Sequence, residues 1–398
     1  MIYPAKETTA GPAGSAGSAG SSPNDALRVM LVDDSAIIRG LISKMISPDP
    51  EIFVAASVAD GAQAVKRLGQ RDIDVIVLDI EMPVMDGLTA LPKLIEVDPN
   101  VKIVMASTLT DRNADISLKA LEAGAADYVP KPTSTTKIAG ASEFRRELLE
   151  KIKILGVAAR RDAGKPLPKP VSSKSATPAA AAAPSAQDSL YSNRPVTLRT
   201  ATSTHKPGIL AIGSSTGGPQ ALLKLMASLK PSINVPVVIT QHMPATFTRI
   251  LAEHIASATE WTCAEAKDGD VLKPGQAYVA PGDFHMEIIK ETAGSVIRLN
   301  QNPPENFCRP AVDPMLRSVS KVFGARVLAT ILTGMGNDGM KGGKVVTEAG
   351  GTVVAQDEKT SVVWGMPGAA ATAGICSAVL PLDELGPHIT GLIGKGVQ

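Results

Sequence analysis

The sequence predicts two α/β domains, each built on a doubly wound parallel sheet, and three observations support this fold class. Short apolar runs alternate with helical patterns over residues 27–155 and again over residues 207–398. Between them, residues 156–206 are rich in alanine, proline and serine and lack the apolar side chains of a core. At 398 residues, the chain has the length of two ordinary domains rather than one.

The predicted strands are the continuously apolar runs of each domain. Ser35 is placed to cap the first helix, and a helical pattern over residues 141–157 closes the first domain. In the first domain, we expect strands over 27–32, 53–59, 74–78, 101–106 and 126–129. In the larger second domain, we expect them over 208–212, 235–240, 277–279, 325–332 and 352–355.

Composition excludes several classes of protein. The net charge of +1 argues against a nucleic-acid-binding surface, and no apolar run is long enough to span a bilayer. Residues 1–26 are rich in glycine, alanine and serine, so they predict a disordered tail rather than a signal peptide. The three cysteines lack the spacing of a metal site or a disulfide framework, which favours a reducing cytoplasm and small buried thiols. They are Cys263, Cys308 and Cys376.

Polar side chains follow four strands of the first domain. Asp33 and Asp34 follow the first strand, Asp79 the third, Ser107 the fourth and Lys131 the fifth. Ligands of open α/β sheets bind beyond these carboxyl ends, so we expect the side chains to converge. Carboxylates gathered there repel one another unless a divalent cation such as Mg²⁺ lies among them. Alone, an Asp-Asp pair is a solvated loop and a Lys-Pro pair is a turn, but the whole arrangement indicates a phosphoryl site.

The first domain resembles the receiver domain of two-component response regulators, which has a flavodoxin-like fold. The matching segments are DIEMPVMDG at residues 79–87 and AGAADYVPKP at residues 123–132. The resemblance implies that a histidine kinase is the phosphate donor and that Asp79 is the acceptor. It implies Mg²⁺ held by Asp34, by Asp33 through water, by Asp79 and by the Glu81 carbonyl. Ser107, or Thr108 one residue later, and Lys131 would then contact the phosphoryl group.

Ser215 is the candidate nucleophile of the second domain. It lies in the segment GSSTGGP at residues 213–219, between a predicted strand and a predicted helix. Glycines permit a sharp turn there, and the free N–H groups of a helix N-terminus could stabilise an oxyanion. The pattern also matches the nucleophile elbow of serine hydrolases. Such turns also cradle phosphates, and Ser215 could be no more than a helix cap.

A serine nucleophile needs a base and an orienting carboxylate. Of the five histidines, His242 follows the strand over residues 235–240 and so lies at the same sheet edge as Ser215. His285 is its rival, and either could instead be a loop histidine bonded to backbone. Asp338 lies on the glycine-rich segment TGMGNDG at residues 333–339, past another strand. The competing carboxylates, Asp313 and Asp283, fit a helix cap and a turn.

The second domain resembles the catalytic domain of the chemotaxis protein-glutamate methylesterases, the CheB family. The matching segments are IGSSTGG (212–218), ITQHMP (239–244), YVAPGD (278–283), RPAVD (309–313), LTGMGNDG (332–339) and GMP (365–367). The order of receiver, linker and esterase is also that of the family.

The resemblance implies a cytoplasmic enzyme that removes methyl groups from glutamate γ-methyl esters of methyl-accepting chemoreceptors and deamidates specific glutamines. Ser215 would be the nucleophile, His242 the base and Asp338 its orienting group, with no cofactor in this domain. The backbone N–H groups of Thr216 and Met335 would form the oxyanion hole. Phosphorylation of Asp79 would activate the hydrolase by moving the receiver off the active site.

Two other functions remain open on the residues alone. One is a phosphorylation-gated binding module that cradles phosphates without hydrolysis, and the other is an esterase that acts outside chemotaxis. A DNA-binding response regulator is disfavoured, because neither a basic patch nor a helix-turn-helix pattern follows the linker.

Overall fold

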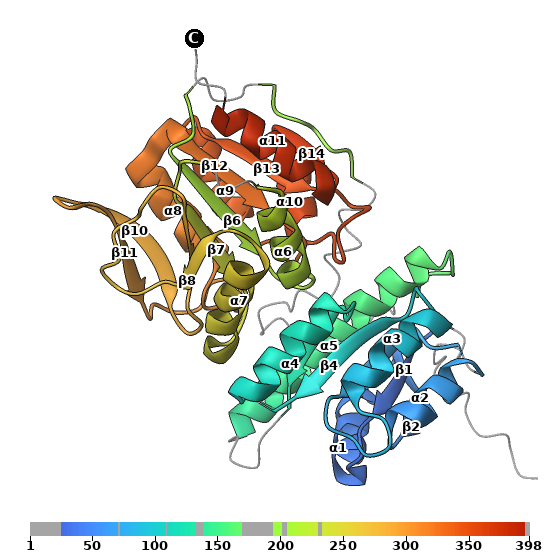
Figure 1. Cartoon of the computed structure of the whole chain (residues 1–398). Coiled ribbons are helices and arrows are strands. Elements are labelled where there is room, and N and C mark those ends of the chain that lie inside the picture. The colour runs from blue at the N-terminus through green and yellow to red at the C-terminus, as the bar shows by residue number, and fades with distance from the viewer. Residues whose placement is uncertain are drawn as a thin grey trace, which may run out of the picture.

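The computed structural model describes residues 25–70, 72–108, 110–131, 138–168, 194–200, 205–229 and 233–394. These residues form two α/β domains (Figure 1), which confirms the predicted fold class. Most of the predicted tail and linker, together with Pro132, lie outside the described residues. Among the described helices, none is long and apolar enough to cross a membrane.

The first domain, called the receiver below after the family that it resembles, is a five-stranded parallel sheet with the order β2-β1-β3-β4-β5. Its strands are β1 (Leu27–Val32), β2 (Ile52–Val58), β3 (Val75–Asp79), β4 (Lys102–Ser107) and β5 (Asp127–Pro130). Its helices are α1 (Ala36–Ile46), α2 (Gly61–Leu68), α3 (Gly87–Val97), α4 (Asp111–Glu122) and α5 (Ile138–Asp162). Ser35 caps α1 as predicted, because its side chain accepts a hydrogen bond from the Ile38 N–H.

The last receiver helix is longer than the sequence predicted. The pattern placed the domain end at residue 155, yet α5 continues to Asp162. The extra turns are held by burial, since the Arg160 guanidinium forms a buried ion pair of 2.9 Å with Asp74. Arg160 also donates a hydrogen bond to the carbonyl of Ala26, so both ends of the domain meet at this side chain. The helix therefore runs past the predicted domain end at residue 155.

The second domain, called the catalytic domain below after the family that it resembles, is a seven-stranded parallel sheet with the order β14-β13-β12-β6-β7-β9-β8, plus the antiparallel hairpin β10–β11. Its strands are β6 (Ile209–Ser214), β7 (Val237–Gln241), β8 (Thr262–Glu265), β9 (Gln276–Val279), β10 (His285–Glu291), β11 (Gly294–Asn300), β12 (Val327–Ile331), β13 (Thr352–Gln356) and β14 (Ala378–Leu380). Its helices are α6 (Gly218–Ser228), α7 (Ala245–Ala258), α8 (Val312–Phe323), α9 (Met340–Glu348), α10 (Met366–Thr372) and α11 (Leu382–Gly394).

Strands β8, β10, β11 and β14 were not predicted. They lack a continuous buried run: β10 and β11 have one solvated side, and β8 and β14 are short edge strands. The five predicted strands include the central ones, β6, β7 and β12, whose residues are all buried. A search for buried runs therefore finds the centre of a sheet and misses its edges.

The two domains pack against each other through α4 of the receiver and α6 and α7 of the catalytic domain (Figure 1). Tyr128 on β5 stacks on Phe247 of α7, with ring centroids 4.3 Å apart. Both rings are buried, so this contact removes two large apolar surfaces from water. The Gln220 side chain at the start of α6 donates a 2.5 Å hydrogen bond to the Ala125 carbonyl.

Candidate active site and phosphoryl-acceptor site

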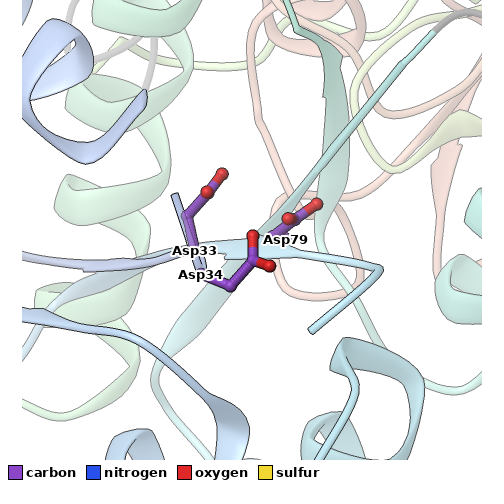
Figure 2. Close-up of side chains that lie close together, drawn as sticks. All are labelled: Asp33, Asp34 and Asp79. Atoms are coloured by element: carbon purple, nitrogen blue, oxygen red, sulfur yellow. The ribbon is translucent and has the colours of Figure 1, made fainter. Parts of the chain in front are cut away.

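The carboxyl ends of the receiver strands bring three carboxylates together. Figure 2 shows Asp33, Asp34 and Asp79 side by side, and one oxygen from each lies within 4.8 Å of the others. Asp33 and Asp79 are buried, whereas Asp34 is exposed. The Lys131 ammonium lies 2.6 Å from both buried carboxylates. The structure thus places four of the predicted phosphoryl-site residues in one cluster.

The cluster suits a small hard cation. Burial raises the pKa of Asp79 above its usual value, although the hydrogen bond and charge of Lys131 act in the opposite direction. Asp34 and Glu81 both line an adjacent cavity of about 430 Å³. Oxygen ligands with open space beside them are what Mg²⁺ requires, because the ion keeps several waters.

Ser107 is buried at the end of β4 and turned toward α4. Its hydroxyl lies 3.1 Å from that of Ser117, while its carbonyl accepts a hydrogen bond from the Lys131 N–H. Thr108, the alternative, is exposed and accepts a hydrogen bond from Asn113. Ser107 therefore has the burial and the neighbours of a phosphoryl-site residue, but its hydroxyl points to Ser117 in this structure.

Ser215 lies in the turn between β6 and α6, at the carboxyl edge of the larger sheet. Gly217, with φ of 74°, is the N-cap of α6, so Ser215 is not the helix cap that the sequence left possible. A Cβ on Gly334 would stand 2.8 Å from that of Ser215, so only glycine allows the loop after β12 to approach this closely. The turn and the loop therefore meet at Ser215.

Gln241 holds the serine and histidine segments together, and the sequence analysis missed it. The buried side chain accepts a hydrogen bond from the Ser214 hydroxyl and donates to the carbonyls of Ser215 and His242. The available signal was a polar residue at the end of a buried strand, directly before a candidate histidine. Such a side chain must find partners within the protein.

His242 lies between a carboxylate and a thiol. Its Nε2 is 2.8 Å from Asp338 Oδ2, and its Nδ1 is 3.3 Å from the sulfur of Cys308. Burial lowers the pKa of His242, but the charges and hydrogen bonds of Cys308 and Asp338 outweigh it and raise the pKa to about 10. Cys308 lines the cavity and Cys263 is partly exposed, so the prediction that all three cysteines are buried was wrong for two.

Asp338 caps the start of α8, and Asp313, in the first turn of α8, caps the start of α9. Asp338 is buried and accepts hydrogen bonds from the Val312 and Asp313 N–H groups at the start of α8. Burial raises its pKa, but His242 and these N–H groups lower the pKa below its usual value overall. Asp313 accepts from the Gly339 and Gly342 N–H groups at the start of α9.

The competing residues have structural roles. His285 is buried, its Nε2 lies 3.1 Å from the Pro303 carbonyl and its Nδ1 accepts from the Ala311 N–H. This is the backbone-bonded histidine that the sequence left open. Asp313 is the cap described above, and Asp283 lies in a turn with φ of 66°. Asn306, also missed in the sequence, donates to both Asp338 and Asp313 and links the two carboxylates.

Ser215, His242 and Asp338 line one cavity of about 590 Å³. Thr216 and Met335 also line it, and their backbone N–H groups have no hydrogen-bond partner within the described part of the chain. Across the described residues, no hydrogen bond joins the Ser215 hydroxyl to His242, because Asp338 and Cys308 occupy both ring nitrogens.

The receiver forms one wall of this cavity. Six receiver residues line it, from β5 and α5: Asp127, Tyr128, Arg146, Glu147, Glu150 and Lys151. The Arg146 guanidinium stacks over the Phe307 ring on the opposite wall, 5.1 Å from its centroid. The cavity beside Ser215 is therefore bounded by side chains of both domains.

Two family models match the chain: the response regulator receiver domain over residues 29–143 and CheB methylesterase over residues 210–389. With the fold, they define the class as a response regulator whose second domain is an enzyme. A protein-glutamate methylesterase/protein-glutamine glutaminase of Paramagnetospirillum magneticum is 55% identical over 93% of this chain and 97% of its own. One of Azospirillum brasilense is 57% identical over 95% of each chain.

The chain belongs to this family of methylesterases. Among solved structures, the methylesterase catalytic domain of Thermotoga maritima CheB is 40% identical. The match covers 47% of this chain and 98% of that one, with a TM-score of 0.46.

Proposed function

We propose that the chain hydrolyses glutamate γ-methyl esters on methyl-accepting chemoreceptors, and deamidates specific receptor glutamines, when its receiver is phosphorylated on Asp79. The arrangement of Ser215, His242 and Asp338 around one cavity carries this proposal. The family relatives supply the substrate class. A histidine kinase is the proposed phosphate donor, and the cytoplasm is the proposed location because chemoreceptor methyl esters face it.

The chemistry follows from the site. The Ser215 oxygen attacks the ester carbonyl while its proton passes to His242, which Asp338 orients. The Thr216 and Met335 N–H groups donate to the oxyanion. His242 then protonates the leaving methoxide, and methanol departs. Water, deprotonated by His242, attacks the acyl-serine and frees the glutamate. The same steps with ammonia as leaving group convert glutamine to glutamate.

The packing of the domains supports gating by phosphorylation. The receiver forms one wall of the cavity and Cys308 contacts His242, and we assign this arrangement to the inactive state. Phosphate on Asp79 would draw Lys131 and the Ser107 hydroxyl toward it, and Ser107 would leave Ser117 on α4. Because α4 packs on α7, its displacement loosens the interface. The cluster of Asp33, Asp34 and Asp79 would hold the Mg²⁺ that phosphoryl transfer requires.

We expect phosphorylation to accelerate methanol release from methylated receptors. With an acyl-phosphate donor and Mg²⁺, the intact protein should gain about tenfold in rate or more, a shift that needs only about 1.4 kcal/mol of differential affinity. The Asp79→Asn variant should not respond to the donor. A chain that begins at His205 should be active without it, because it lacks the receiver wall.

Receptors stripped of methyl esters are the substrate control and should release no methanol. Lower basal activity in the chain that begins at His205, together with no response of the intact protein to the donor, would rule out inhibition by the receiver. Activity on other esters but not on receptors would favour a target outside chemotaxis.

His254 on α7 lies between two carboxylates of the receiver helix α4. Its Nε2 is 2.9 Å from Asp115 and its Nδ1 is 2.8 Å from Glu122. Burial lowers the pKa of His254, but the hydrogen bonds and charges of the two carboxylates raise the pKa overall. The other charged groups of the two helices at this contact are Lys119, paired with Asp115, and Arg249, paired with Asp111 and Glu253.

We therefore expect inhibition by the receiver to weaken as the pH rises. The pKa of His254 is raised only while the receiver packs on the catalytic domain. The ion pairs of His254 therefore stabilise this packed state fully below about pH 6.5, and this stabilisation is lost as the pH rises through the raised pKa. The measurement is the activity of the unphosphorylated protein divided by that of the chain beginning at His205. From pH 6 to pH 9 this ratio should rise about twofold to fivefold, because partly exposed ion pairs stabilise a packed state only weakly.

The His254→Gln variant should show a nearly flat ratio across the same range. His388→Gln is the matched control, because Figure 1 places α11 on the side of the catalytic domain away from the receiver. An equal rise in the ratio for His254→Gln would show that another group controls the interface.

A further inference from the structure

Cys308 contacts the active-site histidine, and the mechanism above gives it no role. Its sulfur lies 3.3 Å from His242 Nδ1, while Asp338 is 2.8 Å from Nε2 on the other side of the ring. Thiol, imidazole and carboxylate therefore stand in the order that activates cysteine nucleophiles in enzymes. The reactive form of a cysteine is the thiolate, and the His242 ring beside the sulfur can take the thiol proton.

The thiol is held at this place by the chain around it. Glu305 and Cys308 exchange two backbone hydrogen bonds across a tight turn, of 3.1 and 2.9 Å. The two residues within the turn, Asn306 and Phe307, both have positive φ, of 52° and 63°. Asn306 in turn donates to Asp338. Cys308 is therefore positioned by the same segment that braces the carboxylate of the site.

Cys308 is also the cysteine that reagents can reach in the cavity. It is half-buried and lines the cavity of about 590 Å³ together with Ser215. Burial raises the pKa of Cys263 and that of Cys376 to about 12, so both thiols stay protonated and unreactive near neutral pH. Neither lines the cavity. The chain thus offers one accessible thiol with a base beside it and two inert thiols for comparison.

We propose that Cys308 is a reversible oxidation site that switches the hydrolase off when it reacts with a hydroperoxide. The thiolate sulfur attacks the outer oxygen of the peroxide, and the O–O bond breaks. The sulfur loses two electrons to the peroxide, and the imidazolium proton of His242 passes to the departing oxygen. The products are a sulfenic acid on Cys308 and an alcohol, or water from hydrogen peroxide.

The sulfenic acid blocks catalysis because it keeps His242 from acting as the general base. The added oxygen lies beside His242 Nδ1 and fills part of the cavity. It hinders Ser215 from replacing Cys308 as the hydrogen-bond partner of Nδ1, a replacement that base catalysis requires. A small thiol reverses the reaction in two steps. The first thiol forms a mixed disulfide with release of water, and the second restores Cys308 and leaves as the oxidised disulfide.

The experiment treats the full-length protein with hydrogen peroxide and then traps sulfenic acid with dimedone. Peptide mass mapping should locate the adduct on Cys308 and not on Cys263 or Cys376. Methanol release from methylated receptors, measured with the acyl-phosphate donor, should fall about tenfold or more, the scale of losing general-base catalysis. It should return after dithiothreitol. The adduct is measured without hydrolysis, so it stands even if the assignment of Ser215 fails.

Three variants separate this proposal from a general oxidation of the protein. For Cys308→Ser, the ratio of treated to untreated activity should stay near one, whatever its basal rate. Cys263→Ala is the matched control and should keep the full loss. His242→Ala should form the adduct more slowly, by about tenfold or more, because the proton donor is gone. An equal loss of activity in Cys308→Ser, or an adduct on Cys308 without loss of activity, would overturn the proposal.

Discussion

Replacing Ser215 with alanine should abolish ester hydrolysis while the protein stays folded. Removal of a catalytic serine from a triad lowers turnover on the order of a millionfold, because the acyl-enzyme can no longer form. Within the described residues, Ser215 makes its hydrogen bonds through its backbone, since its carbonyl accepts from Gln241 and its N–H donates to the Thr333 carbonyl, so loss of the hydroxyl should cost little stability. Methanol release from methylated receptors, with the phosphate donor present, is the measurement.

The matched control is Ser214→Ala, one residue earlier. Ser214 is buried and its hydroxyl donates to Gln241, so this change disturbs packing without removing the nucleophile. A fluorophosphonate probe should label the native protein and Ser214→Ala at Ser215, and should leave Ser215→Ala unlabelled. If Ser215→Ala kept more than about a tenth of the activity, the nucleophile would be another residue. Failure of the probe on the native protein would favour a binding module.

The polar site residues at the strand ends of both domains could be predicted from the sequence, because the geometry of a parallel sheet brings them together. In a parallel sheet, the carboxyl ends of the strands lie at one edge, so a polar residue after a buried run can be placed without knowing the fold in detail. Asp33, Asp79 and Lys131 meet in this way in the receiver. Ser215 and His242 do so in the catalytic domain, where β6 and β7 are neighbours.

The side chains that complete the site could not be predicted, because no periodic pattern places them. Cys308 and Asn306 come from the turn after the β10–β11 hairpin, which has no buried run. Their contacts with His242 and Asp338 span 66 and 32 residues of the chain. The end of α5 was missed for a similar reason, since the burial of Arg160 depends on Asp74, 86 residues away. Local sequence patterns predict helices and strands, whereas these contacts depend on the tertiary fold.

Replacing His242 with alanine should be nearly as damaging as the loss of Ser215, because nucleophile and base act as a unit. We expect a loss of turnover on the order of a millionfold in methanol release. The loss of the ring also leaves Asp338 without its charged partner, but the backbone N–H groups of Val312, Asp313 and Gly339 still hold that carboxylate. The fold should therefore survive, and the thermal unfolding midpoint checks this.

His285→Ala is the matched control, since it removes a buried histidine from the same domain. Its ring joins the Pro303 carbonyl to the Ala311 N–H and touches neither Ser215 nor Asp338. The change leaves the buried Ala311 N–H unpaired, so it should lower the free energy of unfolding by about 1 to 3 kcal/mol. The fraction that remains folded should keep most of its turnover. If His285→Ala lost more turnover than His242→Ala at equal folded fraction, His285 would be the base.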